Sequence, residues 1–381
     1  MQKISPHRRW LGVALALNAL LMIAVLTLTL WLVAAKLDKD RAQSDLTTTI
    51  NRIVEQANPA TVTIMNNLNA SFSYVWPHEA YHRLGAGFVV SADGLILTNR
   101  QAVPNPDLDY TVVFADGKSY PAHDIYRDPI YDLVLLQIDA TGLPVLPLAG
   151  DTPPLAGEPV IALGNRWQQD AAYVSTGRIT AVNRQSTVLY DEPTTDANNQ
   201  TTYTRVTRIY HGVLLADSEF NFGNAGGPLI NAQGAVAGLI FTSDSAANQG
   251  FAIPAIDLRF VVDSFRQHGK IVQPDIGVTD YLLGARLEPG DQGFVYGAMI
   301  STFCSNAPAA AVGLKSHDRI TAIDGVAIGL AMPLERSLRR YDPGDQVLVT
   351  YLTAAGEAKE TVVTLFDRAT ATGQSDVSCI P

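Results

Sequence analysis

Short runs of β-branched and aromatic residues, separated by Gly, Pro, Asn and Asp, fill residues 61–256, and this texture constrains the fold more than any other feature. Runs of this length and spacing are typical of β-sandwiches and β-barrels. One hairpin is nearly explicit, because apolar runs at residues 88–90 and 95–97 flank Asp93-Gly94, a pair that tolerates positive φ. The central part of the chain is therefore predicted to be mainly β.

Two segments of this region depart from the β texture. Residues 184–204 are polar and Thr-rich, and we predict an exposed loop or an excursion from the barrel there. Apolar residues recur at helical spacing across residues 257–268, and Gly269 follows them. This pattern predicts a helix that closes the first domain.

An uncharged apolar run, residues 10–35, precedes the β region. At 1.5 Å per residue it is long enough to cross a hydrocarbon core of about 30 Å. A cleaved signal peptide is the competing interpretation, but secretory apolar cores run only about 7 to 15 residues. We therefore predict a short tail over residues 1–9 and an N-terminal single transmembrane helix over residues 10–35. Basic residues flank both ends, so charge does not fix the orientation in the membrane.

The segment after the apolar run has no Gly or Pro over residues 36–57, which predicts a helical stalk, and Asn58-Pro59 ends it. At 381 residues the chain is expected to hold two or three domains. The net charge of -10 and the absence of a Lys/Arg stripe give no general attraction for phosphate backbones. Nucleic acid is therefore not an expected partner, and no cofactor or metal ion is expected.

Residues 217–231, DSEFNFGNAGGPLIN, say most about chemistry. The segment resembles the nucleophile region of the HtrA/Deg family of trypsin-like serine proteases, whose GNSGGP frame lets two backbone N–H groups point at the developing oxyanion. The resemblance covers residues 58–368 and continues in the family's order through GAGFVVSADGLILTN, DPIYDLVLLQID, IALGN, STGRITAVNR and QGFAIPAIDL. It implies a mainly β fold, with a trypsin-like double β-barrel over residues 58–268 followed by an α+β PDZ domain.

Position by position, the resemblance exposes departures at the catalytic triad. The family has a His in a TNxHxV context as its general base, whereas this chain reads TNRQAV and carries Gln101 there. Ala225 occupies the position of the nucleophile, and Asp132 matches the acid. The oxyanion-hole donors, the backbone N–H groups of Gly223 and Ala225, need no side chain. We expect no proteolysis, and we expect Asp132 to accept backbone N–H bonds instead of orienting an imidazole.

Three alternatives to a natural pseudoprotease are weaker. A deliberate inactivation at Ala225 would have left the base in place, and Gln101 argues against it. His82 and His123 lie in the wrong part of the frame to replace the base. Ser218 as a substitute nucleophile has no base at a persuasive spacing.

Residues 271–368 resemble the PDZ domains that follow HtrA protease units, on the segments SNAPAAAVGLKSHDRITAIDGVAI, DPGDQVLVTYL and KETVVTLF. PDZ domains bind peptides by adding a strand to a sheet edge, while loop N–H groups take the terminal carboxylate. The corresponding loop here is Asp275, Ile276, Gly277 and Val278, and residues 330–339 are the predicted helix across the groove. The charge of Asp275 is expected to weaken the binding of free C-termini. The alternative is that this domain binds no peptide and acts only as a spacer or packs against the first domain.

Both cysteines of the chain, Cys304 and Cys379, lie in or after this second domain. If the soluble part lies outside the cytoplasm, as in the resembling family, we predict one disulfide that pins the loose tail of residues 369–381.

The sequence thus indicates a membrane-anchored, catalytically inactive HtrA-like protein that binds unfolded or C-terminal peptide segments, with its soluble domains in the periplasm or outside the cell. An active HtrA-type endopeptidase and a structural subunit of a membrane complex remain as alternatives. The family resemblance also implies a homotrimer as a possible assembly.

Overall fold

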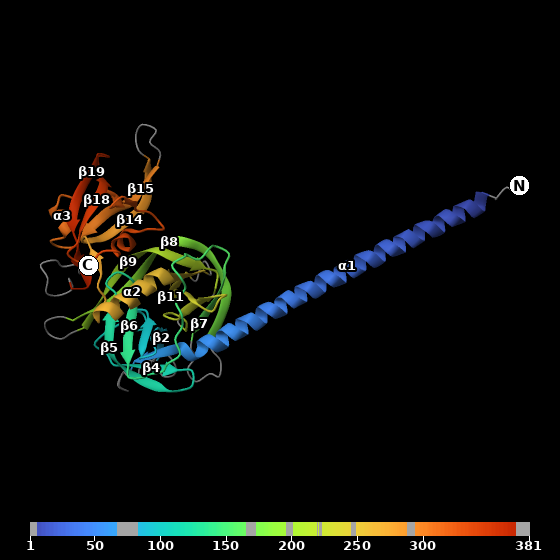
Figure 1. Cartoon of the computed structure of the whole chain (residues 1–381), viewed down its shortest axis with the longest axis horizontal. Coiled ribbons are helices and arrows are strands. Elements are labelled where there is room, and N and C mark those ends of the chain that lie inside the picture. The colour runs from blue at the N-terminus through green and yellow to red at the C-terminus, as the bar shows by residue number, and fades with distance from the viewer. Residues whose placement is uncertain are drawn as a thin grey trace. The chain divides into compact units, whose positions relative to one another are not determined.

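The computed structural model describes residues 6–66, 83–164, 173–195, 201–218, 220, 223–244, 249–287 and 294–370 (Figure 1). The chain divides into two compact units, Met1–Ile53 and Val54–Pro381. The second unit holds every candidate site residue.

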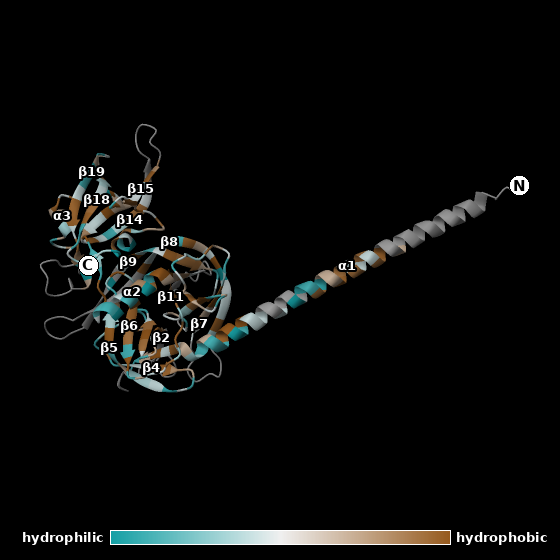
Figure 2. Ribbon diagram, viewed as in Figure 1, coloured by the Kyte–Doolittle hydropathy of each residue, from teal (hydrophilic) through white to brown (hydrophobic). Residues whose placement is uncertain are grey.

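Helix α1, Pro6–Ala57, forms one continuous helix of 52 residues through the predicted anchor and stalk. It ends where Asn58-Pro59 begins a single 3-10 turn, Asn58–Ala60, as predicted. The large apolar side chains described between Met22 and Leu37 are more than half exposed, and Figure 2 colours much of this stretch brown. Within the described residues, no helix has a stretch both long and apolar enough to span a bilayer.

The first six strands form a closed antiparallel barrel in the order β1-β2-β3-β6-β5-β4. The predicted hairpin is confirmed, because Phe88 pairs with Leu97 and Gly94 adopts a φ of 101° in the turn between them. The strands are β1 (Thr61–Asn66), β2 (Arg83–Val89), β3 (Leu95–Thr98), β4 (Tyr110–Phe114), β5 (Ser119–Arg127) and β6 (Val134–Ile138).

The next six strands close a second barrel, in the order β10-β11-β12-β9-β8-β7. Helix α2, Ala255–His268, follows it and ends at Gly269, whose φ of 67° and N–H bond to the Phe265 carbonyl form a left-handed cap, as predicted. The strands are β7 (Pro159–Gly164), β8 (Tyr173–Thr195), β9 (Thr201–Ala216), β10 (Pro228–Asn231), β11 (Val236–Asp244) and β12 (Gln249–Pro254).

Of the two forms predicted for residues 184–204, the loop is wrong for the residues that the structure describes, because they form strands. Strands β8 and β9 run through this segment and pair as far as Thr195 opposite Thr201. The segment is rich in Thr and holds two Tyr, which favour extended backbone, and the strand pairing satisfies backbone polar groups. Its polar composition did not exclude regular structure.

The last domain is built on a six-stranded sheet with the main order β14-β15-β16-β18-β19, and β14 lies at one edge of that order. Its elements are β13 (Pro274–Asp275), β14 (Val278–Leu287), β15 (Phe294–Phe303), α3 (Pro308–Ala311), β16 (Arg319–Ile323), β17 (Val326–Ala327), α4 (Leu334–Leu338), β18 (Gln346–Leu352), β19 (Ala358–Thr364) and β20 (Phe366–Asp367).

The helix predicted over residues 330–339 is shorter than expected, because α4 begins only after Pro333, which is extended with a ψ of 165°. Its Leu334 and Leu338 join a core that includes Ile276, Val278 and Tyr281. Helix α4 and the start of β14 therefore share one core.

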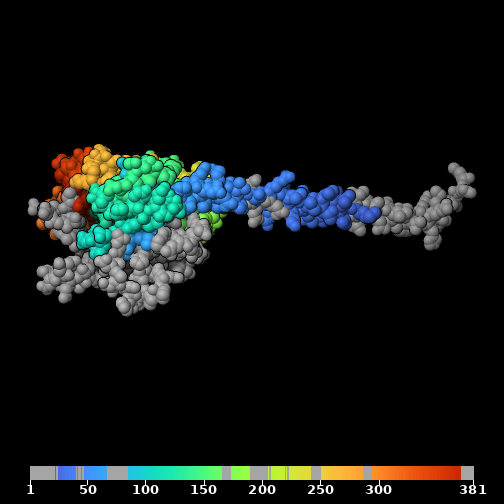
Figure 3. All heavy atoms as spheres, turned by 90° about the horizontal axis from the view of Figure 1, so that it is seen from below, coloured from blue at the N-terminus to red at the C-terminus, as the bar shows by residue number. Residues whose placement is uncertain are grey.

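Figure 3 shows the first barrel, in teal and green, beside the orange and red C-terminal residues on this face.

Candidate functional site

The turn that carries Gln101 follows β3 and is held by its own neighbours. The Oδ1 atom of buried Asn99 accepts a hydrogen bond from the Ala102 N–H at 3.0 Å, and Thr98 Oγ1 donates to the Ala86 carbonyl at 2.6 Å. Gln101 itself is half-buried. A carboxamide accepts no proton near neutral pH, so this turn supplies no general base.

The side chain of Asp132 holds the turn that carries Gln101. Its buried carboxylate accepts a hydrogen bond from the Arg100 N–H at 2.9 Å. The Arg100 guanidinium in turn donates to the Asp128 carbonyl at 2.5 Å. This geometry agrees with the expected structural role of Asp132, which is to accept a backbone N–H bond.

Asp128 is a buried carboxyl that the sequence interpretation missed. Its Oδ1 atom accepts the Ile130 N–H at 2.8 Å, so the side chain shapes the turn that delivers Asp132. Burial raises the pKa of Asp128, and the N–H group of Tyr131 opposes this. The signal was present in the sequence as an Asp directly before Pro129, a common way to start a turn.

The turn at the nucleophile position keeps its backbone frame although Ala225 has no hydroxyl. Gly226 adopts a φ of 82°, and its N–H donates to the Ile240 carbonyl at 2.7 Å. A Cβ atom at Gly226 would come within 2.3 Å of the Ala86 carbonyl oxygen. The glycines therefore remain necessary for packing and backbone conformation alone.

The structure brings the two degenerate positions together around Gly85 of β2. A Cβ atom there would lie 2.7 Å from Ala102 Cβ and 2.9 Å from the Ala225 carbonyl oxygen. The Ala225 carbonyl accepts the Ala86 N–H at 2.8 Å. The turns that carry Gln101 and Ala225 thus meet at strand β2. The oxyanion role of the Gly223 and Ala225 N–H groups stays a prediction.

No substitute catalytic group emerges among the described residues of this site. His123 is exposed on β5, with ring nitrogens 2.8 Å from Asp124 and 3.3 Å from Asp139. Ser218 is only 1% exposed, too buried to attack a polypeptide. His82 lies outside the described residues.

The loop expected to bind a terminal carboxylate is occupied from within the chain. The Oδ1 atom of Asp275 accepts the Gly277 N–H at 2.5 Å, and its Oδ2 atom lies 2.8 Å from Arg368 Nη1. Arg368 also donates to the Val278 carbonyl at 2.9 Å. Arg368 thus pairs with the charge of Asp275, and the expected weakening of free C-terminus binding stays a prediction.

Tyr281 joins β14 to α4. Its hydroxyl donates to Glu335 and accepts the Leu334 N–H at 3.2 Å, so the ring spans from the strand to the first residue of the helix. Tyr131 of the first domain also donates to Glu335, at 3.3 Å. Burial raises the pKa of Tyr281 well above its ordinary value, and Glu335 adds to this.

Helix α4 is held on helix α2 by buried ion pairs. Arg336 Nη2 lies 2.8 Å from Asp257 Oδ2, and Arg339 pairs with the other oxygen of the same carboxylate. The Arg339 guanidinium lies 4.9 Å from the ring centre of Tyr131 and 4.5 Å from that of Phe260. The sequence interpretation missed this cluster, whose members are far apart in the chain.

His211 of β9 completes this interface. Its ring stacks on Tyr281 with centroids 4.2 Å apart and planes inclined by 22°. Burial lowers the pKa of His211, while Glu335, the Tyr281 backbone and Asp280 oppose this. Burial therefore favours the neutral imidazole, in a site that the second barrel and the last domain share.

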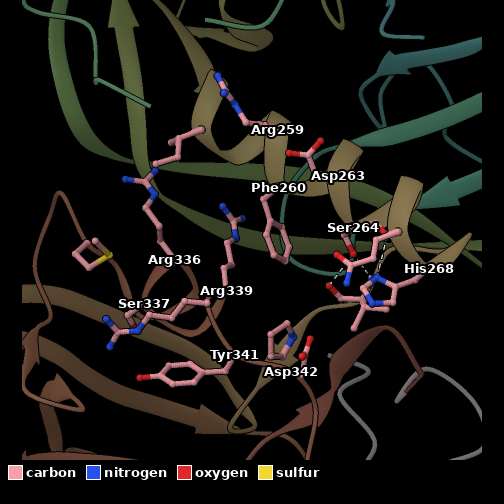
Figure 4. A pocket seen from close by; sticks show the side chains of 16 residues that line it. Arg259, Phe260, Asp263, Ser264, His268, Arg336, Ser337, Arg339, Tyr341 and Asp342 are labelled. Carbon is pink, nitrogen blue, oxygen red and sulfur yellow. Dashed lines mark hydrogen bonds between the residues drawn. The ribbon is translucent and has the colours of Figure 1, made fainter. Parts of the chain in front are cut away.

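A cavity of about 490 Å³ opens beside these ion pairs, between α2 and the segment that carries α4 (Figure 4). Phe260, Ser264, His268, Arg336 and Tyr341 are among its lining residues. The cavity is separate from the degenerate triad. Among the described residues there is also no cluster of three His, Cys, Asp or Glu side chains that would hold a metal ion.

Cys304 is buried at the end of β15, where its N–H donates to the Gly277 carbonyl at 2.8 Å. Cys379 lies outside the described residues. Cys304 is disulfide-bonded, and Cys379, the only other cysteine of the sequence, stays its predicted partner.

Two barrels with a triad-like site between them, followed by a PDZ-type sheet, define the class of trypsin-like peptidases that carry a PDZ domain. Residues 85–239 match the trypsin-like peptidase domain family, and residues 281–365 match the PDZ domain family. The chain belongs to the HtrA family of trypsin-like serine proteases with a C-terminal PDZ domain.

Relatives with curated names are bacterial proteases. The probable periplasmic serine endoprotease DegP-like of Halomonas elongata is 31% identical over 294 residues, which cover 76% of this chain and 57% of the relative. The serine protease Do-like HtrB of Bacillus subtilis is 31% identical over 272 residues, covering 68% of this chain and 56% of the relative. This chain therefore spans little more than half the length of these relatives.

Solved structures support the same fold. The HtrA-type protease AlgW with tripeptide is 25% identical with a TM-score of 0.58, covering 82% of this chain and 95% of that one. The serine endoprotease from Yersinia pestis is 24% identical with a TM-score of 0.54, covering 83% of this chain and 97% of that one.

Proposed function

We propose that this protein is a catalytically inactive member of the HtrA family that acts by binding polypeptide. One observation carries the proposal: Gln101 and Ala225 replace the base and the nucleophile in a site whose backbone turns are intact. Acyl transfer needs an activated hydroxyl or thiol, and neither is present at that position. An oxyanion hole alone would leave a small residual activity at best.

Binding is the function that remains when hydrolysis is absent. The structural relatives include the HtrA-type protease AlgW with a tripeptide and with a decapeptide, so peptide binding is a property of similar folds. Strand β14 is at the edge of its sheet, the position where PDZ domains add a peptide strand. We infer that unfolded or extended segments of other proteins are the ligands.

Membrane anchoring in the cell envelope is part of the same proposal. Residues 10–35 are uncharged and apolar and lie within α1, and the large apolar side chains described there, such as Leu30 and Trp31, are more than half exposed. An exposed surface of this kind is stable in lipid but not in water. Relatives are named periplasmic, which supports soluble domains on that side of a single-pass anchor.

The test is incubation of the purified full chain with fluorescent unfolded casein. The fluorescence anisotropy should rise on binding, while gel analysis should show intact casein after overnight incubation. Casein fragments whose formation stops on substitution of one other serine would overturn the inactive assignment and favour an active endopeptidase. Carbonate extraction of native membranes tests the anchor separately, because an anchored chain should stay in the pellet.

A structural role in a membrane complex is the second candidate, and the domain interface favours it. Asp257, Arg336 and Arg339 hold the last domain on the first through buried ion pairs. Absence of casein and peptide binding, together with stable partner chains in native membranes, would favour this role. A homotrimer is one form that such an assembly would take, and sedimentation of the detergent-solubilised chain tests it.

A further inference from the structure

The start of β14 offers the groups that a terminal residue of a bound peptide would use. A peptide that adds to a sheet edge and ends there needs N–H groups of the loop for its carboxylate and a strand carbonyl for its own N–H. At this edge those groups include the Gly277 N–H and the Val278 carbonyl. Both already have partners in the chain.

Two side chains supply these partners. Asp275 presents a carboxylate oxygen to the Gly277 N–H at 2.5 Å, and Arg368 presents a guanidinium N–H to the Val278 carbonyl at 2.9 Å. The two side chains are joined to each other at 2.8 Å. Together they reproduce the carboxylate and the N–H donor of a terminal residue.

This pair is well shielded from water. The Asp275 side chain is 6% exposed and that of Arg368 is 12% exposed. A peptide carboxylate that took the Gly277 N–H would displace Asp275 and leave its charge buried with fewer partners, which is costly. Competition for the same donor, not long-range repulsion, therefore opposes a free C-terminus here.

We propose that the Asp275–Arg368 pair acts as an internal substitute for a peptide terminus, and that the PDZ domain takes internal extended segments of polypeptide. The inference rests on the proposed binding function and names its ligand class. Ligand pairing uses the β14 edge beyond Val278, because that edge continues to Leu287 and pairs only with β15 among the described residues.

The experiment uses the full chain and two fluorescent decapeptide pools, randomised at nine positions and ending in valine, one as the free acid and one as the amide. We expect the native chain to bind both pools with affinities within about twofold, because the terminal carboxylate finds no vacant donor. Asp275→Ala should then favour the free acid by about tenfold or more, because it frees both the Gly277 N–H and Arg368.

Asp275→Asn is the matched variant, since its amide oxygen retains the acceptor for Gly277 while the ion pair to Arg368 is lost. The increase in affinity for the free acid relative to the amide should be smaller in Asp275→Asn than in Asp275→Ala. This variant preserves the turn, so it keeps the test valid where Asp275→Ala fails to fold by circular dichroism.

A native chain that already prefers the free acid by tenfold would overturn the internal-terminus inference and leave the binding function in place. A ratio of free-acid to amide affinity that stays unchanged in both variants would also overturn the inference and leave the binding function in place. If no pool binds to any of the three proteins at millimolar concentration, the proposed binding function fails instead.

Discussion

Arg336 Nη2 lies 2.8 Å from Asp257 Oδ2 across the boundary between the two folded domains, and both side chains are nearly excluded from water. Asp257 is in the first turn of α2, and Arg336 is in α4. A carboxylate without solvent contact is tolerated only with charged or hydrogen-bonded partners. The pair therefore makes the position of α4, which packs with the start of β14, depend on the first domain.

Asp257→Asn should lower the free energy of unfolding by about 3 to 5 kcal/mol, because it leaves Arg336 and Arg339 buried without their carboxylate. Urea denaturation followed by tryptophan fluorescence measures this. Asp263→Asn is the control on the same helix, since its exposed pair with Arg266 should contribute nothing measurable. Equal effects of the two substitutions would contradict the buried-pair account.

Tyr281→Phe should cost about 1 to 3 kcal/mol, because the Leu334 N–H and a Glu335 oxygen lose a buried partner. The same denaturation experiment applies. Tyr296→Phe removes a hydroxyl from a half-exposed ring on β15 and should leave the midpoint unchanged. A Tyr281→Phe protein as stable as the native chain would show that the bridge across the groove is not formed in solution.

Stability should fall as the pH drops below about 6.5, the ordinary pKa of histidine. Burial lowers the pKa of His211 in the folded chain, so the unfolded chain takes up a proton before the folded chain does as the pH falls. This proton uptake stabilises the unfolded state relative to the folded state until the pH passes the folded pKa. One such group accounts for at most about 1.4 kcal/mol per pH unit. His211→Gln should flatten the slope between pH 8 and 5, whereas His123→Gln, an exposed ring, should retain it.

Restoring both missing groups tests the triad geometry. The double variant Gln101→His with Ala225→Ser should react with a fluorophosphonate probe, because Asp132 and the backbone turns are in place. The single variant Ala225→Ser should react far more slowly, and the native chain not at all. Gel fluorescence measures labelling, and a double variant no more reactive than the single one would show that the frame itself has lost catalytic geometry.

Non-reducing peptide mapping of protein isolated under alkylating conditions should recover a peptide that joins Cys304 and Cys379. Reduction should release both peptides. Two alkylated cysteines in the unreduced sample would contradict the predicted bond.

The strand pattern, the Asp93-Gly94 hairpin and the end of α2 at Gly269 were predictable from sequence, because each depends on neighbours within a few residues. The missing chemistry was equally visible, since Gln101 and Ala225 stand in motifs with fixed spacing. The error over residues 184–204 has a related origin, because polar composition alone does not distinguish a strand from a loop.

Tertiary structure decided the state of the charged groups. The sequence predicted no partner for Asp275, and Arg368, which pairs with it, lies 93 positions away. Asp257 and Arg336 are separated by 79 positions. No local pattern encodes such pairs, because their proximity arises only when distant parts of the chain fold and pack. The sequence determined which residues stand at the catalytic positions, and the fold determined which charged side chains pair with one another.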